Sequence, residues 1–418
     1  MVKMMMRDVS ERVLLNSEKN IGIIQALLVF ITWYHPHVFW GHQATNLLHL
    51  AMAAVVDLGI DRQQSMAGES FKLAAMKNAH GDRFVQRTPT LEEYRTLAGV
   101  FYLTSTVATS FRKIEAIPYS KYLEECMTSL LHTREYDSDA LLVQIVRLQS
   151  IAQEAHTTET SSAPIQMYIN AFVADLDREH AGNQSVRNEG DNDLRLEQLQ
   201  FLTCKIHCYE LSLNQLQQQD TNKASSRAAL RAHLPDLYCL MEAIQAFTDL
   251  FFTIPIDEYL TTTFAVWGQF AHCFMVLSKL ASLEIDGWDY QSCHTRFVKI
   301  VDEATSYYDR AGQSSPDGLT VINDSFAKWA NKLRFLKSLH LPKILDRQIV
   351  NDDHMATAPM QSATQPGRYE QVAVVGGAQQ QPTPPDDWLP PDFFGIDDWN
   401  SLIADADFGF AADQMMQT

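Results

Sequence analysis

The chain has 418 residues, and 46% of them are hydrophobic, which is enough to build a large core. Its formal net charge is −18, of which residues 351–418 contribute −10, so residues 1–350 are also acidic. Sequence-independent affinity for nucleic acid comes mostly from Lys and Arg that neutralise phosphates. No short run dense in Lys or Arg offsets the acidic balance, so we do not expect this chain to bind DNA by itself.

The six cysteines are scattered without the spacing of a disulfide framework, and the N-terminus lacks the pattern of a secretory signal. We therefore expect reduced thiols in an intracellular protein. The longest apolar run, Ile21–Trp33, has 13 residues, whereas a membrane-spanning helix needs about 20. This run predicts a buried helix and no membrane association.

From about Val9 to Leu339, apolar residues recur three and four positions apart, which predicts helices almost throughout. The expected fold is all-α, a large multi-helix bundle or irregular helical array. Residues 21–34 are apolar nearly all round, so this helix is expected at the centre of the array. The next helical segment has a one-sided apolar stripe and is followed by Gly59, a candidate C-terminal cap. This segment and residues 21–34 together predict a helical hairpin.

Further start signals are a capping box formed by Thr90 and Glu93 and, ahead of the following helix, Pro118. Loops are expected where polar residues cluster, at residues 62–81, 179–192 and 312–318. The remaining helices are predicted at residues 139–154, 165–178, 193–216, 227–250, 257–283, 289–309 and 319–339.

The composition changes after the helical pattern ends, which divides the chain into three predicted parts. Residues 1–345 form the helical body. Residues 346–385 are rich in Gln, Pro, Gly, Ala and Thr and predict a flexible linker, because they cannot bury enough apolar surface to offset their ordering entropy. Residues 386–418 form an acidic, aromatic, disordered tail.

The tail has the composition of a transcriptional activation segment. Residues 386–413 contain eight Asp and no Lys, Arg or Glu. Mutual repulsion of the aspartates keeps the chain from collapsing onto its aromatic side chains, which stay available for a partner's groove. The alternative is a solvated tail without a partner. The residues expected to bind a coactivator or the transcription machinery are Trp388, Phe393, Phe394, Trp399, Leu402, Phe408 and Phe410.

Several blocks of the body carry a resemblance to a known family, and their order and spacing matter more than any single block. They are Gln25 to Leu28, Trp33-Tyr34, Asn46 to Ala51, Asp57 to Arg62, Tyr94-Arg95, Phe101 to Thr106, Tyr119 to Cys126 and Asp139 to Gln149. Together they resemble the middle homology region of fungal zinc-cluster transcription factors. The resemblance implies an all-helical regulatory domain and a nuclear protein.

Members of that family typically carry, near the N-terminus, a basic module in which six cysteines hold two zinc ions. The first cysteine of this sequence is Cys126, and the residues before it contain no counterpart of that module. The resemblance therefore implies either a regulator that acts through a DNA-bound partner protein or part of a longer factor. The matching residues Trp33, Tyr34 and Gly59 are expected to be structural, and Asp57 is a candidate ion-pair partner of Arg62.

The sequence signals for a metal site are weak. Cys204 and Cys208 share a helical face near His207, but zinc needs four ligands, so buried thiols are favoured. The histidines around Pro36, namely His35, His37 and His42, are more typical of helix caps or partly buried rings. No metal, cofactor or catalytic residue is therefore predicted.

The alternative to a regulator is an all-helical small-molecule-binding protein or an enzyme of the terpenoid-cyclase type. Such an enzyme needs acidic motifs that face a cavity from two helices. Asp191 and Asp193 are expected in a loop, and Asn323-Asp324-Ser325 lacks the later acidic residue. The sequence thus favours a nuclear, non-enzymatic transcriptional regulator, an activator or co-regulator, plausible for a metabolic gene cluster. Its target genes, effector and oligomeric state leave no readable trace.

Overall fold

The computed structural model describes residues 2–33, 43–62, 89–112, 114–158, 163–183, 191–218, 231–259, 261–283 and 285–313, together with parts of 327–338. These residues form helices and turns, without a strand among them, which confirms the all-α prediction. The elements are α1 (Val2–Val9), η1 (Ser10–Leu15), α2 (Ile21–Trp33), α4 (Gln43–Leu58), α6 (Leu91–Phe111), α7 (Lys121–Thr133), α8 (Ser138–Thr157), α9 (Ile165–Asn183), α10 (Asp191–Gln218), α12 (Leu234–Phe251), η4 (Ile256–Glu258), α13 (Phe264–Ala281) and α14 (Tyr290–Gln313).

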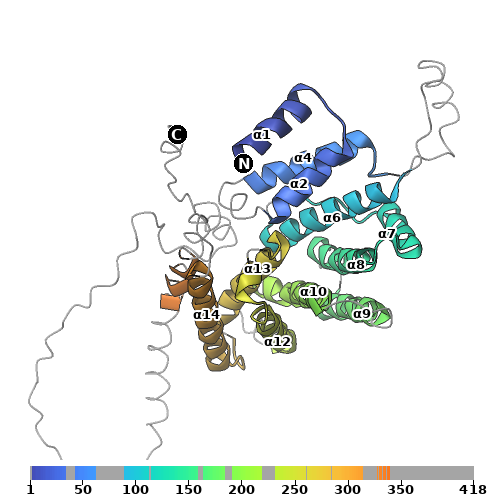
Figure 1. The fold of residues 1–418 in the computed structure, drawn as a ribbon. Helices are drawn as coiled ribbons and strands as arrows, with labels where there is room; N and C mark the ends of the chain where they lie inside the picture. Colours follow the sequence, from blue (N-terminus) through green and yellow to red (C-terminus); the bar gives the residue numbers. More distant parts are fainter. Residues whose placement is uncertain are drawn as a thin grey trace, which may run out of the picture.

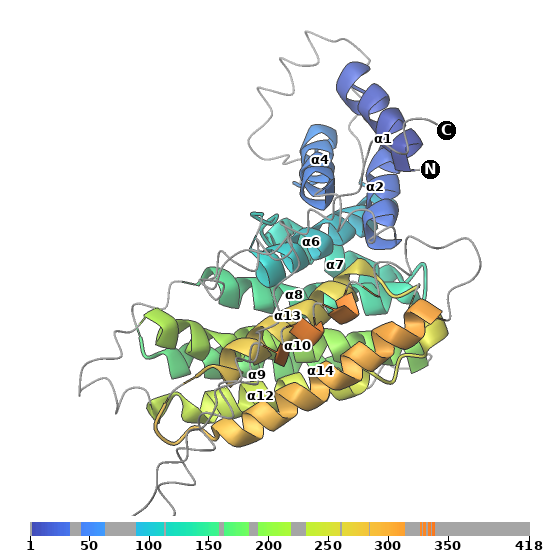
Figure 2. The ribbon, with the colours of Figure 1, turned by 90° about the vertical axis from the view of Figure 1, so that its left-hand side faces the viewer.

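The helices are stacked as an irregular array (Figure 1). Helices α1, α2 and α4 lie at one end, and α12 and α14 lie at the other (Figure 2). Between them, α6 packs on α8 and α13, and α10 packs on α8, α12 and α13. Helices α6, α8, α10 and α13 therefore form the middle of the array.

Local sequence signals set several helix ends. The Thr90 hydroxyl accepts a hydrogen bond from the Glu93 amide, and the Glu93 carboxylate accepts one from the Thr90 amide, which confirms the predicted capping box of α6. The cap of α7 is Ser120, two residues after the expected Pro118. Gly59 ends α4 with a φ of 66°, a left-handed conformation that glycine adopts without a Cβ clash.

The prediction that residues 21–34 lie at the centre of the array is wrong. In α2, Ile24, Leu27 and Ile31 are buried, but Val29 is 56% exposed and Trp33 is 49% exposed. The helix lies near the end of the array, so the neighbouring helices cover one face only. Trp33, which was expected to be structural, is therefore only half buried.

Several helix boundaries and one ion pair differ from the predicted ones. The helix expected at 257–283 is divided into η4 and α13, and the Thr261 and Thr262 hydroxyls between them donate to the Glu258 carbonyl. Helix α9 extends to Asn183, and α10 begins at Asp191. Arg62 pairs with Asp61 at 3.4 Å instead of with Asp57.

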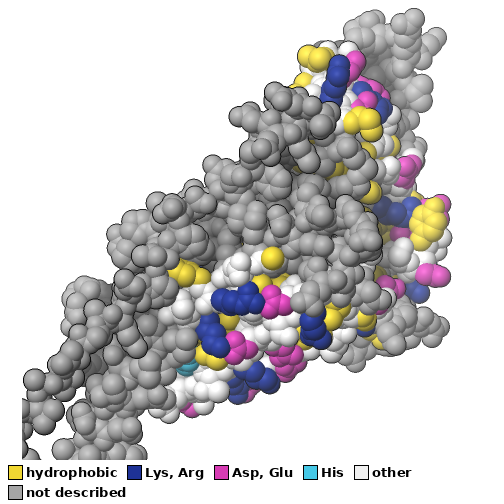
Figure 3. Space-filling model, turned by 60° about the vertical axis from the view of Figure 1, so that its left-hand side comes forward, with side chains coloured by type: hydrophobic (Ala, Val, Ile, Leu, Met, Phe, Trp, Pro, Cys, Tyr) yellow, Lys and Arg dark blue, Asp and Glu magenta, His cyan; other side chains and the backbone are white. Residues whose placement is uncertain are grey.

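The described surface mixes both signs of charge. On the face drawn in Figure 3, Lys and Arg side chains lie beside Asp and Glu. An example of such pairing is Lys337 with Asp302, whose Nζ and Oδ1 atoms are 2.6 Å apart. Within the described ranges, no helix is both long and apolar enough to cross a membrane.

Candidate functional site

Two apolar clusters make up the core, and buried polar side chains lie on the helices where the clusters meet. One cluster is built mainly on α1 to α8 and includes Phe264 and Ala271 of α13; the other is built on α8 to α14. Eight of the buried polar residues on α6, α8, α10 and α13 are called the polar seam here. They are Ser105, Thr109, Gln149, Gln200, His207, Glu210, Gln269 and His272.

One end of the polar seam is a network of amides centred on Gln200. Its Oε1 accepts hydrogen bonds from the Tyr102 hydroxyl at 2.9 Å and from Gln269 Nε2 at 2.6 Å. Its Nε2 donates to Gln149 Oε1 at 2.8 Å and to Cys204 Sγ at 3.2 Å. All four hydrogen-bonding positions of this fully buried amide are thus used, which specifies how α6, α8, α10 and α13 pack.

The other end of the polar seam is charged and is centred on Glu210. Its Oε2 lies 2.9 Å from His272 Nε2 and 3.9 Å from His207 Nδ1. Its Oε1 lies 3.5 Å from Lys279 Nζ and 3.7 Å from the Arg112 guanidinium. Burial raises the pKa of Glu210, but His272, Lys279 and Arg112 outweigh burial and hold this pKa well below its usual value.

The two imidazole rings at this end are tilted by 33° to each other and lie in different environments. Their centroids are 4.4 Å apart. Nδ1 of His272 lies 3.3 Å from the Ser110 carbonyl oxygen, whereas Nε2 of His207 has no hydrogen-bond partner among the described residues. Burial, and then the neighbouring His272, lower the pKa of His207 well below its usual value, so its neutral form is favoured.

Among the described residues, Cys204 and Cys208 do not belong to a group of three potential metal ligands. Cys204 Sγ donates to the Leu148 carbonyl at 3.3 Å, and burial raises the pKa of Cys204 to about 12. Burial also raises the pKa of Cys208 well above its usual value. Both are buried free thiols, as favoured from the sequence.

The sequence analysis did not predict that His207 and Glu210 lie beside His272. One signal in the sequence points to part of this group, namely the spacing that places His207 and Glu210 on one face of a helix. Nothing in the sequence joins them to His272.

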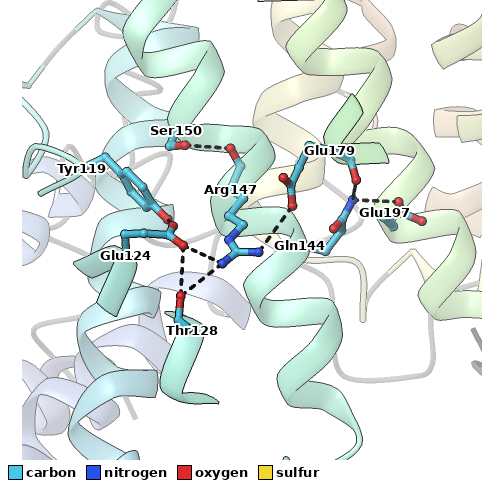
Figure 4. A network of polar contacts seen from close by, with 8 residues as sticks. All are labelled: Tyr119, Glu124, Thr128, Gln144, Arg147, Ser150, Glu179 and Glu197. Carbon is cyan, nitrogen blue, oxygen red and sulfur yellow. Dashed lines mark hydrogen bonds and ion pairs between the residues drawn. The ribbon is translucent and has the colours of Figure 1, made fainter. Parts of the chain in front are cut away.

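A second polar network lies on α7, α8, α9 and α10 (Figure 4). Arg147 of α8 lies 2.6 Å from Glu124 Oε1 of α7 and 3.8 Å from Glu179 Oε1 of α9. Glu124 also accepts a hydrogen bond from the Tyr119 hydroxyl. Gln144 donates to the Glu179 carbonyl at 3.3 Å. These contacts join four helices to one another, so we interpret the network as structural.

A cavity of about 200 Å³ opens between the start of α10, η4 and the start of α13. It is lined by apolar side chains, by Thr261 to Thr263 and by Asn192, and an ion pair of 3.5 Å joins Arg195 and Glu258. Ligand sites are usually larger, about 300–1,000 Å³. Asp193 lies in the first turn of α10, not in the expected loop, and it does not line this cavity. The cavity therefore lacks the paired acidic motifs that a terpenoid cyclase requires.

The predicted partner-binding residues of the tail lie outside the described residues, as do His35, His37 and His42. They remain predictions. These residues are Trp388, Phe393, Phe394, Trp399, Leu402, Phe408 and Phe410.

The class of protein follows from an all-helical body and from its relatives. The chain is 21% identical over 341 residues to the transcription factor opdL of Penicillium oxalicum, covering 78% of this chain and 59% of that protein. It is 24% identical over 298 residues to the transcription factor himD of Aspergillus japonicus, covering 67% of this chain and 46% of himD. A stretch of 156 residues is 32% identical to the transcription factor pbcR of Emericella nidulans, covering 35% of this chain and 21% of pbcR.

These similarities support a fungal transcriptional regulator and confirm the resemblance found in the sequence. The chain spans about half the length of the two relatives that it matches over the longest stretches. No family model and no solved structure matches it.

Proposed function

We propose that this chain is a fungal-type transcriptional regulator of the nucleus. Its helical body, residues 1–345, is the regulatory domain, and residues 386–418 are the activation segment. The observation that carries the proposal is the similarity to fungal transcription factors over 78% of the chain, combined with the acidic, aromatic composition of residues 386–413. A non-enzymatic role agrees with the names of the relatives, which are transcription factors.

The charge balance supports action through a DNA-bound partner or as part of a longer zinc-cluster factor. Residues 1–350 carry a net charge of −8, and the described Lys and Arg side chains of Figure 3 lie next to acidic ones. Such a surface repels the phosphate backbone. In this proposal the regulator brings the activation segment to a promoter, and the segment recruits a coactivator.

The activation segment works by coupled folding and binding. Ile396, Trp399, Leu402 and Ile403 fall on one face of a short helix that is marginal in water and is stabilised in a partner's apolar groove. The surrounding aspartates meet the basic rim of that groove. Trp399 and Phe394 are the aromatic anchors of this interaction.

A reporter experiment tests this function. Residues 386–418 are fused to an unrelated DNA-binding domain, and we expect activation of the reporter gene. Replacing Trp399 and Phe394 together by Ala should lower activation at least about tenfold, because buried aromatic anchors at interfaces commonly contribute 2 kcal/mol or more. The Ser401→Ala variant is the matched control and should activate normally. A wild-type fusion that leaves the reporter silent at normal protein levels contradicts the proposal.

A further inference from the structure

The charged end of the polar seam brings three metal-binding residue types together in the protein interior. His207 and Glu210 lie on one face of α10, and His272 of α13 faces them. Each offers one ligand atom, and the three atoms lie within 4.8 Å of one another. All three side chains are at most 5% exposed. This grouping plays no part in the proposed function and has no counterpart in the cysteine-rich zinc module of the resembled family.

The hydrogen bonding of His272 leaves an unbalanced contact. Its Nδ1 lies 3.3 Å from the Ser110 carbonyl oxygen, which can only accept, so Nδ1 carries the hydrogen atom. When the ring is neutral, Nε2 presents a lone pair, and it lies 2.9 Å from Glu210 Oε2. This pair does not have hydrogen-bond geometry. Two electron-rich atoms at this distance repel each other unless a cation lies between them.

We propose that His207, Glu210 and His272 bind a divalent transition-metal ion, with zinc as the best-suited class. Two imidazoles and one carboxylate are a common zinc ligand set that leaves one position for water or another ligand. Ligand atoms about 2.0–2.2 Å from one ion lie roughly 3–3.5 Å from each other. The separation of His272 Nε2 and Glu210 Oε2 is already 2.9 Å. His207 Nδ1 is 3.9 Å from the same oxygen, so it must move closer by less than about 1 Å.

The surroundings provide the supporting contacts that metal ligands usually have. Ligating histidines typically donate their second ring nitrogen to a carbonyl or carboxylate, and ligating carboxylates are held by further donors. The Ser110 carbonyl orients His272 in this way. Lys279 and Arg112 hold Oε1 of Glu210, which leaves Oε2 for the ion. Both cationic side chains are partly exposed, at 22% and 32%.

The same two cationic side chains repel a bound metal ion. The direction in which metal affinity changes when one of them is removed can therefore be predicted and measured. Removing the Lys279 charge should tighten metal binding, because repulsion is lost while Arg112 still holds Oε1 of Glu210. A proton on His272 is the competing explanation: an imidazolium ion would pair with Glu210 without any metal. That explanation predicts no metal uptake by the wild-type chain or by Lys279→Met.

The experiment uses the full-length chain, treated with a chelator and then titrated with Co²⁺ and Zn²⁺. The visible absorption of Co²⁺ reports its ligands, and elemental analysis reports the zinc content. We expect about one ion per chain, at least about 100-fold weaker binding for His207→Gln and His272→Gln, and tighter binding for Lys279→Met. His132→Gln, at an exposed position on α7, is the matched control and should bind normally. Circular dichroism of each variant checks that the helical fold is retained.

Two results overturn the proposal. Absence of ion uptake by both the wild type and Lys279→Met identifies the cluster as an imidazolium and carboxylate pair. Uptake that survives His272→Gln and disappears in Cys204→Ser or Cys208→Ser, with intense thiolate absorption, places the ion on sulfur. If His272→Gln does not fold, the opposite shifts expected for His207→Gln and Lys279→Met still decide the question.

Discussion

Gln200 illustrates how a single residue organises the middle of the protein. Its side-chain amide makes four hydrogen bonds to groups on α6, α8, α10 and α13 and is 0% exposed. A buried amide is stable only when its hydrogen bonds are made, because desolvation without a partner costs free energy. The network therefore favours one arrangement of these helices over alternatives that apolar contacts alone would tolerate.

Replacing Gln200 by Ala should destabilise the fold strongly. The variant leaves Tyr102, Gln269 and Gln149 with unpaired buried groups, and we expect the free energy of unfolding to fall by about 2–4 kcal/mol. Urea unfolding monitored by circular dichroism measures this change. The control is Gln291→Ala on the exposed face of α14, which should stay within about 0.5 kcal/mol of wild type. Equal stability of the two variants would argue against the network's role.

At the scale of elements, the close approach of α13 to α6 depends on a glycine. A Cβ atom added at Gly268 of α13 would lie 3.0 Å from Phe111 Cε2 and 3.2 Å from Phe111 Cζ. Phe111 is buried and cannot move aside without disturbing the core. This crossing positions His272 and Gln269, which follow Gly268 along α13, opposite the residues of α10.

Substituting alanine for glycine should therefore have opposite effects at two helical positions. Gly268→Ala is expected to lower the free energy of unfolding by about 1–2 kcal/mol, since overpacking outweighs the gain in helix propensity. Gly182→Ala, in α9, meets no atom within 4 Å and should raise this free energy by about 0.5 kcal/mol. Thermal unfolding of both variants provides the comparison, and a shift of both in the same direction would refute the packing argument.

At the scale of the whole molecule, buried histidines link stability to pH. His233 and His294 are 3% and 5% exposed, and burial lowers the pKa of both. For His233 the nearby Asp236 partly opposes burial. The unfolded chain takes up protons on these histidines near pH 6.5, whereas the folded chain does so only at lower pH. Their contribution to stability is therefore present above about pH 6.5 and is lost as the pH falls below it.

We expect the urea midpoint to decrease between pH 7 and pH 5, with each histidine contributing up to about 1.4 kcal/mol per pH unit. The double variant His233→Gln and His294→Gln should show a flatter pH dependence, whatever its absolute stability. His132→Gln, at an exposed position on α7, should keep the wild-type slope. If the urea midpoints of the double variant and of the wild type change equally with pH, these histidines are not the source of the pH dependence.

The sequence by itself determined the class of fold, the resemblance to fungal transcription factors and the helix ends that depend on local chemistry. The capping box at Thr90 and the left-handed Gly59 are examples, because both are set by residues within one turn of the helix.

Only the tertiary structure decided which residues meet. The apolar periodicity of α2 could not show that Val29 and Trp33 stay exposed, because exposure depends on which neighbouring helices cover each face. The polar seam likewise joins side chains from four helices that are distant in sequence. His207 was grouped with cysteines on its own helix, but its ring faces His272 and Glu210, because the crossing of α10 and α13 determines that contact and local spacing does not.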